Sequence, residues 1–274
     1  MPMNDPTSFI PGAVFVDYTS NPVSIPDDFL TTPPSIPSVH KPIFFPEADL
    51  PEYRYKIAFL IDNVLSQAEC DQLIKLAESS VPLKDDSQSP WKPALIAIGD
   101  GWEVPVPGYR VGDRIIWDNK TIAARLWNRC ILADGVREKM ETVGLEEMGA
   151  WRFHSLNERL RFLKYRKDEY FRAHCDGPTH LLRDGKDLLT HYTLHLYLND
   201  STDNPRPNSD DLVGGATTFS SRDGERRLDV NPKAGSVLIF EHEGLRHEGA
   251  DVIAGVKYTL RSDVFYEWVP SIGV

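Results

Sequence analysis

The spacing of hydrophobic positions changes along this chain, from a helical period near the N-terminus to an alternating one in the C-terminal half. Ser66 and Glu69 form a capping-box pattern, which predicts that a helix starts there. The apolar residues that follow recur at helical spacing and mark one buried face: Cys70, Leu73, Ile74 and Ala77. Asp118 and Asn119 can cap a second helix, whose apolar face comprises Ile122, Leu126, Cys130 and Ala133. A third, short helix is expected near residues 136–142.

From Trp151 to Tyr266 the pattern is that of strands separated by turns. Residues 190–199 alternate, with one face formed by Thr193, His195, Tyr197 and Asn199 and the other by apolar side chains. The last strand, over residues 255–266, carries three polar side chains on one face: Lys257, Thr259 and Arg261. Cations buried on an apolar strand need an anionic partner. Because the helices precede the strands with little βαβ alternation, the sequence predicts a mainly β fold with flanking N-terminal helices, an α+β arrangement.

The N-terminal region has a different composition from the rest. Its first 50 residues contain ten prolines and follow neither period. The boundaries expected are 1–50 for a proline-rich arm and 51–274 for one domain, with a helical flank over 51–150 and a β core over 151–268. The arm also carries apolar side chains, such as Phe15 and Phe29. They leave open whether the arm packs on the core, forms a dimer contact with a second subunit, or is disordered.

Composition limits the classes of partner. The chain has 274 residues and a net charge of −11, which argues against a broad basic surface for nucleic acid. It contains no apolar run of about 18 residues, and its N-terminus lacks the features of a signal peptide, so we expect no membrane span and no secretion. Three widely spaced cysteines fit reduced thiols. We therefore expect a cytoplasmic, or otherwise intracellular, protein.

A candidate metal site lies at the end of a strand-like run. His174 and Asp176 are two residues apart, so on a strand their side chains point to the same face. Such a pair is common by chance, and a solvated turn without chemistry is the simpler interpretation unless a third ligand exists. The later histidines His195, His242 and His247 are the candidates for it.

Several motifs, taken together in their order and spacing, carry a family resemblance. They are His174-x-Asp176, Tyr197-Leu-Asn, Gly214-Gly-x-Thr217-x-Phe219, Pro232-x-x-Gly235, His247, and Lys257 ten residues later. Over about residues 55–268 the chain resembles the iron(II)- and 2-oxoglutarate-dependent dioxygenases of the prolyl 4-hydroxylase type. The resemblance implies a double-stranded β-helix, or jelly roll, with iron near the mouth of the barrel.

The resemblance also implies a set of site residues. His174, Asp176 and His247 would bind Fe(II), since two imidazoles and one carboxylate leave three positions for co-substrate and dioxygen. Lys257 would bind the distal carboxylate of 2-oxoglutarate, with hydrogen bonds from Tyr197 and Tyr165. Arg261 is the reserve candidate for that role, or else holds a carboxylate of the prime substrate. The implied enzyme is a non-haem iron dioxygenase, with O2 as oxidant and ascorbate as a further candidate cofactor.

The implied reaction is oxidation of a C–H bond, in most cases hydroxylation, with release of succinate and CO2. The substrate stays open between a small molecule and a free or peptidyl amino acid, because the fold does not select one. Two alternatives also stay open: a jelly-roll binding or regulatory protein without turnover, and a metalloenzyme independent of 2-oxoglutarate. Four arginines are candidates to bind an acidic substrate, although surface ion pairing is their commoner role: Arg110, Arg114, Arg159 and Arg161.

Overall fold

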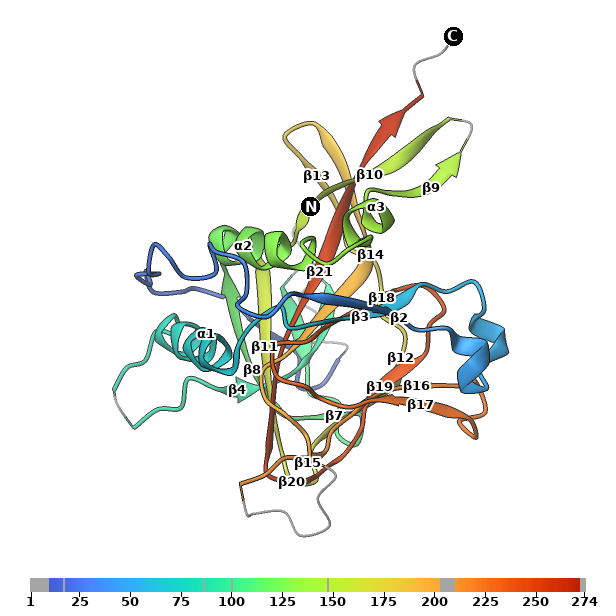
Figure 1. The fold of residues 1–274 in the computed structure, drawn as a ribbon. Helices are drawn as coiled ribbons and strands as arrows, with labels where there is room; N and C mark the ends of the chain where they lie inside the picture. Colours follow the sequence, from blue (N-terminus) through green and yellow to red (C-terminus); the bar gives the residue numbers. More distant parts are fainter. Residues whose placement is uncertain are drawn as a thin grey trace.

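The computed structural model describes residues 10–16, 18–85, 87–99, 101–146, 148–202 and 210–271. Most of the regular structure is antiparallel sheet, and three α-helices lie in the described part of the chain (Figure 1). The helices are α1 (Gln67–Ser79), α2 (Lys120–Cys130) and α3 (Val136–Met140). The predicted α+β arrangement, mainly β with helices in its N-terminal half, is confirmed.

The largest of the four sheets in the described part of the chain has eleven strands. Its central path follows the order β2 (Val39–Pro42), β3 (Ala58–Asp62), β18 (Val237–Glu241), β14 (Lys186–Tyr197), β21 (Val256–Pro270), β11 (Arg159–Arg166), β8 (Asp113–Asp118) and β4 (Lys92–Pro93). Three strands attach beside this path: β9 (Thr142–Glu146), β10 (Gly149–Leu156) and β13 (His180–Arg183). We call this the major sheet.

A five-stranded minor sheet faces part of the major one. Its order is β17 (Arg227–Val230), β16 (Thr217–Ser220), β19 (His247–Gly249), β12 (Tyr170–His174) and β7 (Arg110–Val111). Phe219 of the minor sheet meets Phe240 of the major sheet edge to face, with ring centroids 5.4 Å apart. Two antiparallel sheets packed in this way form the expected jelly-roll core. Two small sheets complete the fold: β1 (Val14–Phe15) with β6 (Trp102–Val104) and β5 (Ile96–Gly99), and β15 (Val213–Gly214) with β20 (Val252–Ala254).

The helices cover the opposite face of the major sheet. Ser66 caps α1 and forms the predicted capping box with Glu69, and Asn119 caps α2. Leu73 of α1 and Leu126 of α2 are fully buried in one core cluster with Leu194 of β14. In Figure 1 both helices lie on one side of the molecule and the minor sheet on the other. The alternation in β14 therefore sends its leucines toward the helices and Thr193, His195 and Tyr197 toward the minor sheet.

The described part of the N-terminal arm packs on the core. β2 pairs with β3, and the side chains of Phe29, Leu30 and Phe45 are buried. Residues 1–9 lie outside the described residues, and a dimer contact through the arm stays a prediction. The domain boundaries also stay a prediction, although the major sheet includes β2, β3 and β8 from outside residues 151–268. None of the described helices combines the length and the apolar character needed to cross a membrane.

Gly235, just before β18, packs against the backbone of the segment that precedes α1. Its substitution tests this contact. The residue has φ +72°, and a Cβ there would lie 1.8 Å from the carbonyl oxygen of Leu65. Gly224 has φ +79° but nothing within 4 Å of its Cβ position. Gly224→Ala should cost about 1–2 kcal/mol of the free energy of unfolding, from backbone strain alone. Gly235→Ala should cost about 3 kcal/mol or more, since the backbone must also move. Urea unfolding of both variants measures the difference, and equal losses would contradict this packing.

Candidate metal centre

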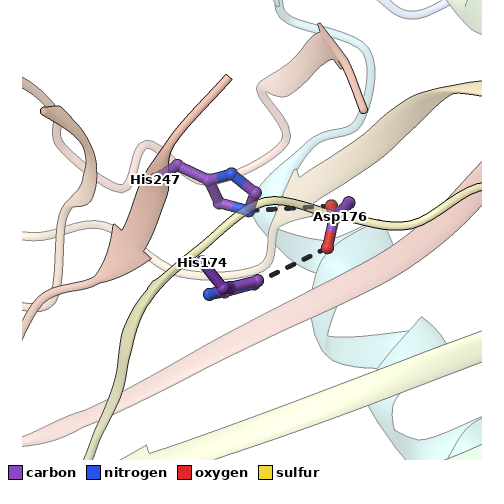
Figure 2. Close-up of side chains that lie close together, drawn as sticks. All are labelled: His174, Asp176 and His247. Atoms are coloured by element: carbon purple, nitrogen blue, oxygen red, sulfur yellow. Dashed lines mark ion pairs between the residues drawn. The ribbon is translucent and has the colours of Figure 1, made fainter. Parts of the chain in front are cut away.

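Three side chains with metal-binding atoms converge at the edge of the cavity between the two sheets. His174 ends β12, Asp176 follows two residues later, and His247 begins β19. One ligand atom from each lies within 4.8 Å of the other two (Figure 2). The pairing of β12 with β19 places His174 directly opposite His247, so the two imidazoles come from neighbouring strands. The expected set is brought together, and among the described residues it is the group that meets this criterion.

Both imidazoles are oriented by a backbone carbonyl two residues earlier. The Nδ1 atom of His174 lies 2.8 Å from the carbonyl oxygen of Arg172, and that of His247 lies 3.1 Å from the oxygen of Leu245. Since a carbonyl can only accept, each Nδ1 carries the proton and each Nε2 presents its lone pair. The Nε2 atoms each lie 3.6 Å from an oxygen of Asp176. This tautomer and orientation are those of metal-ligating histidines.

Aromatic packing fixes the two imidazole rings. Phe171 stacks on His174 with ring centroids 3.8 Å apart, and the pairing of β12 with β19 has a register irregularity between these two residues. Phe240 meets the ring of His247 at 4.6 Å. Burial lowers the pKa of His247 to about 4, so the ring is neutral at pH 7. A neutral imidazole is the form that binds a metal.

The carboxylate of Asp176 is held on both oxygens. Thr193 donates a hydrogen bond to Oδ2 at 2.5 Å, and the Nη2 atom of Arg261 lies 3.0 Å from Oδ1. Burial alone would raise the pKa of Asp176, but Arg261 and the two histidines hold it well below its usual range. The group is therefore ionised, and two histidine nitrogens with one carboxylate form the donor set that non-haem Fe(II) uses. The residues fit that metal.

Lys257 is buried in the same cavity without a carboxylate partner among the described residues. It is 2% exposed and lies on β21, within the major sheet. Its Nζ atom lies 5.8 Å from the ring centroid of Tyr165 and 5.9 Å from that of Tyr197. Burial lowers its pKa to about 7. A bound carboxylate would stabilise the charged form of this buried amine, and the role expected of Lys257 stays a prediction.

The other residues expected to bind 2-oxoglutarate differ in their availability. Arg261 already contacts Asp176 and Asp263, the latter at 3.1 Å, so its charge is balanced. Tyr165 lines the cavity. Tyr197 is fully buried behind it and donates its hydroxyl hydrogen to Thr217 Oγ1 at 2.8 Å. The geometry therefore favours Lys257 over Arg261 as the carboxylate anchor, and the role of Tyr197 stays a prediction.

The cavity has a volume of about 380 Å³ and extends from the three ligands to Lys257. Thr193, which was given no role from the sequence, fixes Asp176. His195, considered as a third ligand, instead lines the cavity outside the three-residue group, and its Nε2 has no hydrogen-bond partner among the described residues. The alternation of β14 places Thr193 and His195 on its inward face. The residues that they contact are known only from the pairing of the strands. His242, considered as a ligand, instead lies 3.6 Å from Asp263 and outside the three-residue group.

Comparison with known proteins supports the same family. Residues 160–262 match the model of the 2OG-Fe(II) oxygenase superfamily, and this segment contains all three ligands and Lys257. No curated protein matches the chain. The predicted family resemblance is confirmed by the match over this segment.

Three solved structures are among those similar to this chain. A Pseudomonas putida prolyl-4-hydroxylase is 16% identical, covers 81% of this chain and 99% of its own, and gives a TM-score of 0.48. A Trichoplax adhaerens prolyl hydroxylase, in complex with a hypoxia inducible factor peptide fragment, is 17% identical with a TM-score of 0.47, covering 77% and 83%. HygX from Streptomyces hygroscopicus, with nickel and 2-oxoglutarate bound, is 14% identical with a TM-score of 0.43, covering 79% and 85%.

Removing a ligand should abolish tight metal binding. His174→Ala deletes one of three donors and should weaken Fe(II) affinity by at least about 100-fold, more than the loss of an outer partner costs. His180→Ala is the matched control, because His180 is exposed, pairs with Asp187 and lies outside the ligand group. Anaerobic calorimetric titration with Fe(II) measures both affinities. Equal affinity in wild type and His174→Ala would show that the metal binds elsewhere.

Proposed function

We propose that this chain, a member of the 2OG-Fe(II) oxygenase superfamily by its residues 160–262, oxidises a C–H bond of a small molecule or an amino acid. The co-substrates are 2-oxoglutarate and O2, and the products include succinate and CO2. One observation carries the proposal: the cavity that holds His174, Asp176 and His247 also holds the unpaired Lys257. A metal triad alone would suit many enzymes, whereas a triad with a buried cation suits a chelating dicarboxylate.

Iron bound to the three ligands would supply the activation of dioxygen. The protein residues position the other components. Lys257 binds the distal carboxylate of 2-oxoglutarate, and the ring of Tyr165 borders that contact. A charge-assisted hydrogen bond in a buried pocket is worth about 1.5–3 kcal/mol, enough to select a dicarboxylate over a monoacid. Arg261 and Thr193 each contact one oxygen of Asp176, so the carboxylate group is not free to rotate.

Consumption of 2-oxoglutarate tests the activity without knowledge of the substrate. Because the proposed metal and 2-oxoglutarate sites are complete without a prime substrate, wild type with Fe(II), ascorbate and O2 should release succinate above background. His174→Ala should release none, since the metal site is incomplete, while His180→Ala should match wild type. Succinate is quantified by mass spectrometry with labelled 2-oxoglutarate. Release that is equal in wild type and His174→Ala would contradict the proposal.

Binding of 2-oxoglutarate should depend on pH through Lys257. With a pKa of about 7 in the free protein, the side chain is charged below pH 7 and loses its charge above it. The bound carboxylate stabilises the charged form and raises this pKa, so affinity should be constant below pH 7. Above pH 7 it should fall by up to about tenfold per pH unit.

Lys257→Arg is the control, because a guanidinium stays charged over this range. Its affinity for 2-oxoglutarate should be nearly constant from pH 6 to pH 9 once corrected for the pH dependence of metal binding, which both proteins share. Calorimetric titration of the metal-loaded, oxygen-free proteins measures both curves. The same decline in wild type and Lys257→Arg would remove Lys257 from the 2-oxoglutarate site.

A further inference from the structure

The cations that line the cavity fall into two groups. Arg114 lies 2.6 Å from Glu103, Arg161 lies 2.9 Å from Asp263, and Arg261 contacts two carboxylates. Lys257 and Arg110 have no ion pair with any described residue. The cavity therefore offers two unpaired positive charges, of which the proposed function uses Lys257.

Arg110 is held next to a metal ligand. It lies on β7, at the edge of the minor sheet, where its backbone pairs with that of Phe171 on β12. Its guanidinium carbon lies 4.5 Å from the ring centroid of Phe171, and the same ring stacks on His174. The Nε atom is buried and has no hydrogen-bond partner. The side chain is thus fixed by a cation–π contact while its hydrogen-bond donors remain available.

A fixed guanidinium with free donors is suited to a carboxylate, which it can bind through two parallel hydrogen bonds. The carboxylates that line the cavity do not fill this role: Asp176 and Asp263 are paired with arginine, and Glu248 forms no ion pair with Arg110. Lys257 lies in the major sheet and Arg110 in the minor sheet. Two anions would therefore be bound from opposite walls of the cavity.

We propose that Arg110 binds a carboxylate of the substrate that is oxidised, and that this substrate is a small free carboxylic acid, such as an amino acid, rather than an internal residue of a peptide. The inference rests on the proposed function, because it assigns Lys257 to 2-oxoglutarate. The cavity of about 380 Å³ has to hold 2-oxoglutarate as well, so the part of the substrate that enters beside it is small. An internal peptide residue presents amides instead of a terminal carboxylate.

Three variants separate charge from packing. Arg110→Met keeps an unbranched apolar side chain over Phe171 and removes the charge, and Arg110→Lys keeps the charge without the two-pronged geometry. Arg152→Met is the matched control, because Arg152 is an exposed arginine of β10 that does not line the cavity. All four proteins, wild type included, are loaded with Fe(II) and saturating 2-oxoglutarate without oxygen. Their thermal unfolding is then followed with the twenty free amino acids, a set of small carboxylic acids, and the corresponding amides.

At least one acid should raise the Tm of wild type and Arg152→Met, while its amide should not. The apparent affinity for that acid should be about 10- to 100-fold weaker in Arg110→Met, with Arg110→Lys between the two. Three outcomes would overturn the inference: no acid stabilises wild type, the amide stabilises as well as the acid, or Arg110→Met responds like wild type.

A separate signal distinguishes this inference from the proposed function. The visible charge-transfer band of the iron and 2-oxoglutarate complex needs no substrate. Arg110→Met should form it with the affinities of wild type. Absence of the band in wild type would reject the proposed function. Its loss in Arg110→Met alone would mean that Arg110 acts by positioning Phe171 and His174, which would overturn the assignment of a carboxylate site.

Discussion

The pairing of β12 with β19 is the contact on which the site depends. It sets His174 opposite His247 and so brings together two residues that are 73 positions apart in the chain. The ligand that follows, Asp176, lies beyond the end of β12, where regular pairing has stopped and the chain can turn toward both rings. A shift of one residue in this register would direct one imidazole away from the other. The minor sheet is short, yet it defines the metal centre.

Charge balance determines which groups remain available for ligands. Asp176 and Asp263 are buried carboxylates, and Arg261 bridges them while Arg161 supplies a second cation to Asp263. Such a network is stable only when its members are paired, since an isolated buried charge costs several kcal/mol. Lys257 stands outside it, and the desolvation that lowers its pKa to about 7 is relieved when an anion arrives. The site is thus arranged to hold a metal on one side and a dicarboxylate on the other.

Features that depend on residues close together in the chain could be predicted from the sequence. The capping box at Ser66, the alternation of β14 and the spacing of His174 and Asp176 each depend on residues close together in the chain, and each is found as expected. The third ligand could be named only through the family resemblance, because His195, His242 and His247 are equivalent by local criteria.

Contacts between distant strands could not be predicted in this way. The ion pair of Arg261 with Asp176 depends on how β21 and β14 are placed against the loop after β12, and no periodicity encodes it. The hydrogen bond from the hydroxyl of Tyr197 to Thr217 of the minor sheet likewise depends on how two distant strands are placed. The four candidate arginines looked alike in the sequence. Only the tertiary structure separates Arg110, which lacks an ion pair among the described residues, from the three that have one.

If one cavity binds both Fe(II) and 2-oxoglutarate, the 2-oxoglutarate chelates the metal. Anaerobic titration of the purified protein with Fe(II) and 2-oxoglutarate, followed by visible absorption, detects this complex. A weak charge-transfer band should appear only after both additions, should be present in His180→Ala and should be absent in His174→Ala. A protein that binds Fe(II) at the three ligands yet gives no band with 2-oxoglutarate would contradict this chelation, and the site would then be that of a different metalloprotein.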